Sequence, residues 1–211
     1  AKIHFDLGNL YNRKEFNDLA LEHLLEALRL NEDLNDSVPL TYNYMAIGNT
    51  YQGIGDFKKS RYYNLQSLKF DLLLNNVDLE ANCYNNMAVL HWFEARNYDS
   101  ARYYFDKALH ALRGPQALTN RYTFLLNRGG MEMDDNNNKE GLKYLYEAKK
   151  IKLPYQDNYS TSALYINIGQ AYAKTGQYDS ASYYLNLGKD MALEIEAYEN
   201  IKNAYSGLFY L

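Results

Sequence analysis

The sequence has little of what stabilises small secreted proteins or anchors a protein in a membrane. A single cysteine, Cys83, excludes an internal disulfide and any cysteine-based zinc cluster. No run approaches the ~20 apolar residues of a transmembrane helix, and no basic stretch followed by an apolar one marks a signal peptide. A formal net charge of −4 argues against nucleic acid as the main partner.

Proline and glycine are also scarce, with 3 and 12 residues among 211, so the chain contains few helix breakers. Hydrophobic residues make up 47% and charged residues 23%, a folded rather than a disordered composition. Tyrosine is abundant, at 23 residues. Its ring fills helix–helix interfaces while its hydroxyl reaches water.

The chain has no initiator methionine and opens within a helical pattern, so we expect it to be part of a longer protein. Its compartment therefore stays open. The cytoplasm is the default, and the periplasm is the alternative if that protein has a signal peptide and a membrane span.

Small residues recur with a period of about forty. One series is Gly8, Gly48, Ala88, Gly129 and Gly169, with spacings of 40, 40, 41 and 40 residues. A second series follows it at Ala20, Ser60, Ala101, Gly141 and Ala181. Aromatic residues lie four positions before the first series, at Tyr44, Tyr84 and Tyr165, with His4 and Leu125 as departures. The chain is therefore predicted to be a series of repeats.

Each repeat is predicted to be a pair of antiparallel helices, A and then B. In the third copy, apolar residues at i, i+3, i+4, i+7 and i+8 from Ala101 form one helical stripe. In the short A–B turns, Gly55, Asn97 and Gly176 are expected to supply the left-handed or turn conformation. The longer B–A connections are expected to hold every proline, namely Pro39, Pro115 and Pro154. Helices approach closely where small side chains meet, so Gly8 is expected to face Ala20.

This order of small, aromatic and turn residues resembles the tetratricopeptide repeat. The fifth copy carries it most fully, with Ile168, Gly169, Tyr172, Gly176, Tyr178, Ala181 and Leu185. The resemblance implies an all-α fold, an α-α superhelix of five helix-turn-helix repeats and a sixth A helix. It implies a single array over 1–211, with repeats at approximately 1–38, 39–78, 79–117, 118–157 and 158–196 and a partial sixth at 197–211.

Some positions depart from the family pattern. Asn64 stands where a large apolar residue is usual, and Arg128 and Glu132 replace an apolar and an aromatic residue. The period also exceeds the usual ~34 residues. Repeats of this length resemble those of bacterial peptide-pheromone receptors and of the sensor segments that precede kinase or LuxR-type DNA-binding domains. That resemblance implies the sensor or interaction part of a larger bacterial signalling or transcription regulator.

No pattern in the sequence indicates catalysis or a cofactor. The stretch from Asp134 to Asn138 lacks the glycine and glutamate of a calcium-binding loop, and turn chemistry explains it. The histidines show no metal-ligand spacing; they are His4, His23, His91 and His110. No nucleophile elbow, P-loop or dinucleotide-binding motif occurs. The sequence therefore predicts a non-catalytic protein with no metal site and no cofactor.

In tetratricopeptide proteins the A helices line a concave groove that binds ligands. Carried onto this chain by the resemblance, the candidate binding residues are Asn9, Arg13, Asn49, Asn86, Asn127, Asn167, Gln170 and Lys174. Asparagine recurs at equivalent positions in three successive repeats, at Asn86, Asn127 and Asn167. A carboxamide can pair with a peptide N–H and C=O at once, which suits an extended peptide. The alternative for each asparagine is that it braces a neighbouring helix.

Two interpretations follow. The first is a binding module for an extended peptide or partner protein, without direct nucleic acid contact and without a membrane segment in this chain. The second is a structural assembly platform, a homo-oligomer formed through residues 198–211. Its basis is the apolar sequence Leu208 to Leu211, which has no following B helix to cover it.

Overall fold

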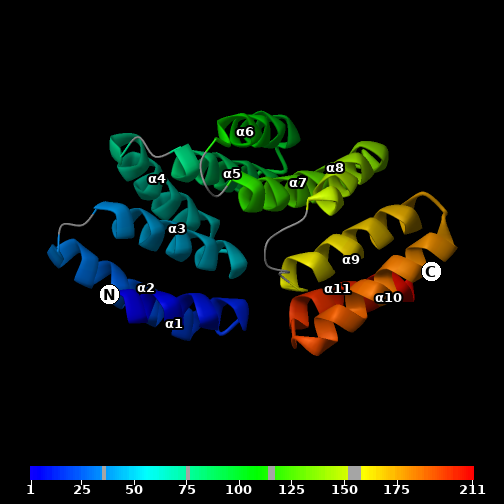
Figure 1. Cartoon of the computed structure of the whole chain (residues 1–211), viewed down its shortest axis with the longest axis horizontal. Helices are drawn as coiled ribbons and strands as arrows, with labels where there is room; N and C mark the ends of the chain where they lie inside the picture. The colour runs from blue at the N-terminus through cyan, green and yellow to red at the C-terminus, as the bar shows by residue number, and fades with distance from the viewer. Residues whose placement is uncertain (35–36, 75–76, 114–116, 152–157) are drawn as a thin grey trace. The chain divides into compact units, whose positions relative to one another are not determined.

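Helices account for the architecture of the computed structural model, which describes residues 1–34, 37–74, 77–113, 117–151 and 158–211 (Figure 1). The A helices are α1 (Lys2–Arg13), α3 (Ser37–Gly53), α5 (Val77–Phe93), α7 (Ala117–Asp134), α9 (Asn158–Lys174) and α11 (Tyr198–Phe209). The B helices are α2 (Asn17–Leu34), α4 (Phe57–Leu74), α6 (Tyr98–Ala111), α8 (Asn138–Lys150) and α10 (Tyr178–Glu194). No strand occurs among the described residues, and the predicted all-α fold of helix pairs is confirmed.

The chain divides into two compact units, residues 1–117 and 118–211, called unit 1 and unit 2 below. In unit 1 each A helix packs mainly on the B helix that follows it, and successive pairs meet through α2 with α3 and α4 with α5. In unit 2, α9 packs on α10, and α11 lies against both of them. The single array over 1–211 and its repeat boundaries stay a prediction. None of the described helices has the length and apolarity to span a bilayer.

The A–B turns share one backbone geometry. In each, one residue has a positive φ, and the amide of the next residue donates to a carbonyl near the end of helix A at 2.8–3.0 Å. The expected glycines occupy this position in two turns, Gly55 with φ 80° and Gly176 with φ 76°. In the third turn Arg96 has the positive φ, so Asn97 does not supply the left-handed conformation. Asn97 caps α6 instead, where its side chain accepts from the Ser100 amide at 3.0 Å.

The prediction that the B–A connections hold every proline is wrong for Pro39, which lies in the first turn of α3. Amides of a first helical turn have no acceptor within the helix, so a proline there removes no hydrogen bond. Pro115 and Pro154 lie outside the described residues.

The recurring small residues lie where paired helices cross. Three pairs show this arrangement: Gly8 with Ala20, Gly129 with Gly141, and Gly169 with Ala181. In each pair, a Cβ atom on the A-helix glycine would lie 3.1–3.2 Å from the carbonyl oxygen of the B-helix residue. The predicted close approach is therefore confirmed. Between α3 and α4, the A-helix glycine Gly48 faces the side chain of Asn64 instead. A Cβ atom on Gly48 would lie 2.8 Å from Asn64 Nδ2.

Candidate functional site

Three aromatic rings meet where helix A crosses helix B, two from helix A and one from helix B. We call each set an aromatic triad. The triads are His4, Tyr11 and His23; Tyr44, Tyr51 and Tyr63; Tyr84, His91 and Tyr104; and Tyr165, Tyr172 and Tyr184. The B-helix ring lies 5.1–6.4 Å from both A-helix rings, measured between centroids. The abundant tyrosines thus stabilise the helix pairs.

Burial and hydrogen bonds shift the pKa values of some triad tyrosines. In unit 1, burial and a hydrogen bond to Glu32 raise the pKa of Tyr44 to about 12. In unit 2, Lys149 donates to the Tyr184 hydroxyl at 2.9 Å, and this bond lowers the pKa of Tyr184. The Lys149 ammonium also lies 4.8–5.8 Å from the ring centroids of Tyr146, Tyr165 and Tyr184. The repeat pattern does not predict this contact, in which a lysine of α8 reaches the aromatic triad between α9 and α10.

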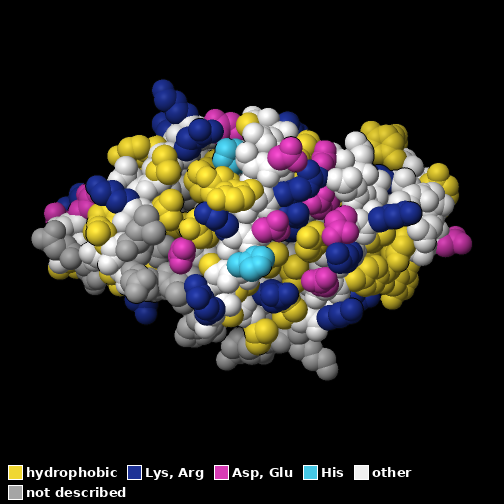
Figure 2. All heavy atoms as spheres, turned by 90° about the horizontal axis from the view of Figure 1, so that it is seen from above, with side chains coloured by type: hydrophobic (Ala, Val, Ile, Leu, Met, Phe, Trp, Pro, Cys, Tyr) yellow, Lys and Arg dark blue, Asp and Glu magenta, His cyan; other side chains and the backbone are white. Residues whose placement is uncertain are grey.

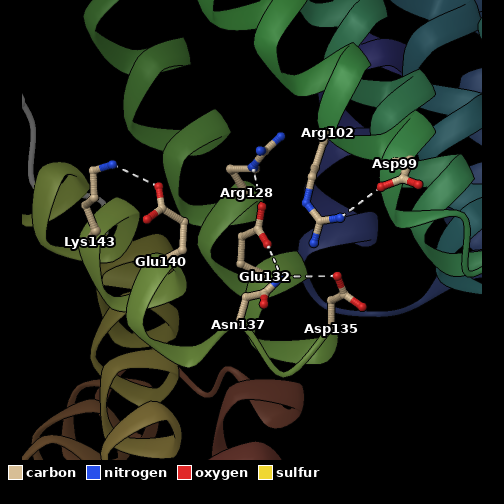
Figure 3. Close-up of polar contacts among 8 residues, drawn as sticks. All are labelled: Asp99, Arg102, Arg128, Glu132, Asp135, Asn137, Glu140 and Lys143. Atoms are coloured by element: carbon tan, nitrogen blue, oxygen red, sulfur yellow. Dashed lines mark hydrogen bonds and ion pairs between the residues drawn. The ribbon is translucent and has the colours of Figure 1, made fainter.

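The fourth repeat replaces the triad by an ion pair (Figure 3). Arg128 Nε lies 3.0 Å from Glu132 Oε1, and the two side chains are 6% and 3% exposed. The Arg128 guanidinium carbon lies 5.2 Å from the centroid of the Tyr144 ring. Asn137 Nδ2 donates to the other Glu132 oxygen at 3.0 Å. The two departures noted in the sequence therefore compensate each other inside unit 2.

The candidate binding residues of unit 1 fall into two environments. Asn49 and Arg13 are exposed, and Asn9 is half-buried on α1. Asn86 is buried, and its Nδ2 donates to Asn64 Oδ1 of α4 at 2.9 Å. Asn64 is buried as well and donates to the Ser60 carbonyl at 3.0 Å. Asn86 therefore braces α5 against α4, the alternative role that the sequence allows for each asparagine.

A signal for this bracing role is present in the sequence. The residue 22 positions before Asn86 is Asn64, which can accept its hydrogen bond. The residues 22 positions before Asn127 and Asn167 are Phe105 and Leu145, whose side chains cannot. Equivalent asparagines thus differ because the preceding B helix differs.

The candidate residues of unit 2 lie on two successive A helices, α7 and α9. Asn127 and Asn167 are half-buried at equivalent positions. Gln170 Nε2 lies 3.4 Å from the Asn203 carbonyl oxygen of α11. Lys174 Nζ donates to the Met133 carbonyl oxygen at 2.8 Å and so links the ends of α9 and α7. Lys174 therefore has a structural bond within the unit, whatever else it contacts.

Charges of both signs are mixed on one face of the molecule. On the face drawn in Figure 2, Lys and Arg side chains lie among Asp and Glu side chains, with hydrophobic side chains between them. Exposed aromatic side chains include Tyr62, Tyr103, Tyr183 and Phe209.

Comparisons with known proteins place this architecture. Residues 81–113 match the sequence model of the tetratricopeptide repeat. No curated protein matches the chain in sequence. The resemblance is thereby confirmed: residues 81–113 match a tetratricopeptide repeat, and the chain has the fold of proteins with TPR-like repeats.

Three solved structures illustrate the likeness. NprR in complex with its cognate peptide NprX has a TM-score of 0.80 at 15% identity, over 98% of this chain and 59% of that chain. A Rap protein complexed with Competence and Sporulation Factor has a TM-score of 0.66 at 12% identity, over 98% and 62%. A putative kinesin light chain with TPR-like repeats from Podosopora anserina has a TM-score of 0.57 at 13% identity, over 92% and 95%. The chain thus spans about three fifths of NprR and of the Rap protein.

Proposed function

We propose that this chain is a non-catalytic binding module whose A helices hold an extended peptide or a segment of a partner protein. It serves as the sensor or interaction part of a larger bacterial regulator, and this domain contacts neither nucleic acid nor membrane. NprR and the Rap protein support the proposal, since each has the same fold and each was solved with a peptide or factor bound. Most of the candidate binding residues are uncharged amides, with Arg13 and Lys174 as the two charged ones, which favours a ligand recognised through its polar backbone rather than through its net charge.

The observation that carries the proposal is the state of Asn167. Its side chain is half-buried on α9 and has no hydrogen-bond partner within the described part of the chain. A carboxamide in that position offers one acceptor and two donors to a ligand. Leu145 stands 22 residues before Asn167, as Asn64 stands 22 residues before Asn86. Its apolar side chain cannot form hydrogen bonds with the Asn167 carboxamide.

We expect alanine at Asn167 or Asn127 to weaken peptide binding about five- to a hundredfold, because peptide groups of the ligand lose their partners in a partly desolvated site. The melting temperature of Asn167→Ala should stay unchanged. The measurement is a peptide-array screen with the full chain, followed by calorimetry of the best peptide at two salt concentrations. Affinity should depend weakly on salt, because the charges on the predicted groove nearly cancel, with Lys2, Arg13 and Lys174 against Asp6 and Asp134.

Asn86→Ala is the matched control for this experiment. It removes a buried bond to Asn64 and should lower the free energy of unfolding by about 1–3 kcal/mol. If Asn167→Ala lowers the melting temperature as Asn86→Ala does and leaves affinity intact, Asn167 is structural and the proposed site is wrong.

A second candidate function is self-association through residues 198–211. Leu208 packs on the cluster of Ile166, Leu185 and Ala204, whereas Phe209 and Tyr210 are 83% and 78% exposed. Adjacent exposed rings on a terminal helix favour contact with another apolar surface.

Sedimentation of the chain over a range of concentrations tests this candidate. We expect a concentration-dependent dimer that Phe209→Glu weakens, because a carboxylate cannot be buried in an apolar contact without a partner. Tyr183→Glu is the control, since Tyr183 is an exposed ring on α10 outside the last helix. A monomer at every concentration, or equal weakening by both variants, contradicts association through residues 198–211.

A further inference from the structure

The first aromatic triad differs from the others in bringing two imidazoles into contact. His4 of α1 and His23 of α2 have their Nδ1 atoms 3.0 Å apart. Their ring centroids are 5.1 Å apart and their planes are tilted by 47°. Both residues are half-buried, so solvent reaches the pair. In the third triad His91 faces Tyr104 instead, and no imidazole lies opposite it there.

The distance between the two nitrogens fits a shared metal ion. Two imidazole nitrogens bound to one Zn²⁺ or Cu²⁺ ion at about 2.0–2.1 Å lie about 2.9–3.4 Å apart for angles between square and tetrahedral. The observed 3.0 Å falls within this range. The two imidazole rings must turn until both Nδ1 lone pairs point at the metal ion. Tyr11 stacks on His23 with centroids 5.5 Å apart and planes within 7°, which supports the His23 ring.

We propose that His4 and His23 form a two-histidine site for a divalent transition-metal ion of the copper and zinc class, which links α1 to α2. Among the described residues no group of three or more His, Cys, Asp or Glu side chains is placed to hold a metal ion. Glu26, one helical turn after His23, has its carboxylate paired with Arg29 at 2.7 Å. Water therefore completes the coordination, and the ion exchanges with solution.

Ion binding requires a proton to change its place. Without metal, one Nδ1 donates to the other across the 3.0 Å contact, so the two neutral rings are opposite tautomers. Coordination needs both Nδ1 lone pairs, and the donated proton moves to Nε2 of its own ring. Both rings stay neutral and no proton is released. Because α1 packs mainly on α2, an ion bound to both helices stabilises the first helix pair by mass action.

Calorimetric titration of the full chain with CuCl₂, NiCl₂ and ZnCl₂, at a pH where an ordinary imidazole is neutral, tests the site. We expect one ion per chain, with Cu²⁺ bound more tightly than Ni²⁺ or Zn²⁺. His4→Tyr and His23→Tyr should each lower the Cu²⁺ affinity by about tenfold or more. Each variant carries the tyrosine found at the equivalent position of the second triad, Tyr44 or Tyr63, so the fold is retained.

His91→Tyr is the control, since it removes a triad histidine that faces no second imidazole, and its Cu²⁺ affinity should equal that of the wild type. Electron paramagnetic resonance of the Cu²⁺ form should show two coordinated nitrogens in the wild type and one fewer in His4→Tyr and His23→Tyr. Equal affinity in the wild type and both variants, or a single coordinated nitrogen in the wild type, would overturn the proposal. The pair would then be an aromatic triad whose histidines share a proton.

Discussion

Replacing Gly169 by leucine is expected to lower the free energy of unfolding of unit 2 by about 1–3 kcal/mol or more. A Cβ atom at this position would lie 2.6 Å from Leu185 Cγ, 2.9 Å from the Leu185 amide nitrogen and 3.1 Å from the Ala181 carbonyl oxygen. A side chain can turn away, but the two backbone atoms belong to α10 and move only if the helix moves. The larger side chain therefore forces α9 and α10 apart.

Thermal unfolding followed by circular dichroism measures this effect. In a unit of this size, 1 kcal/mol corresponds to about 4–8 °C, so the melting temperature should fall by about 4 °C or more. Gly53→Leu is the matched control, because a Cβ atom on Gly53 has no heavy atom within 4 Å. If both variants melt at the wild-type temperature, Gly169 does not lie at a close crossing.

The sequence predicts the architecture well because the constraints on it are steric and recur every forty residues. Each constraint is met by one kind of residue: a glycine at the helix crossing (Gly169), an aromatic ring in the triad (Tyr172) and a glycine with a positive φ in the turn (Gly176). Similar residues recur at the equivalent positions of several repeats. The turn at Arg96 shows where such reasoning ends. Asparagine suits both a left-handed turn and a helix cap, and the sequence does not say which of the two Asn97 adopts.

The binding residues are harder to predict, because a repeat position fixes where a side chain starts but not what it meets. Asn86 and Asn167 are equivalent along the sequence, yet Asn86 bonds to Asn64 in the preceding helix pair. His4 and His23 are 19 residues apart and meet only because α1 and α2 are antiparallel. Such contacts depend on which residue the neighbouring helix places opposite. The sequence pattern of a single helix does not give this information.

Removing the positive partner of the buried ion pair should have the largest effect on stability. Arg128→Met leaves the Glu132 carboxylate 3% exposed and without its cation. Breaking a buried pair in this way costs about 3–5 kcal/mol, because the Glu132 carboxylate stays desolvated while its contact with the guanidinium is lost. The control is Lys143→Met, which breaks the pair of Lys143 with Glu140 (Figure 3). Those side chains are 59% and 45% exposed, so water replaces the lost partner and the melting temperature should not change.

A double variant separates the energetics of the pair from the requirement for charge. At the positions of Arg128 and Glu132 the fifth repeat has Ile168 and Tyr172. Arg128→Ile combined with Glu132→Tyr should therefore restore an apolar residue and an aromatic ring, so that no buried charge remains. Buried ion pairs replaced by packed apolar groups are commonly neutral or up to about 4 kcal/mol more stable. Chemical denaturation of the two single variants and the double variant completes the cycle. A double variant as unstable as Arg128→Met would mean that the fourth repeat needs the ion pair itself, and not merely the absence of an unpaired charge.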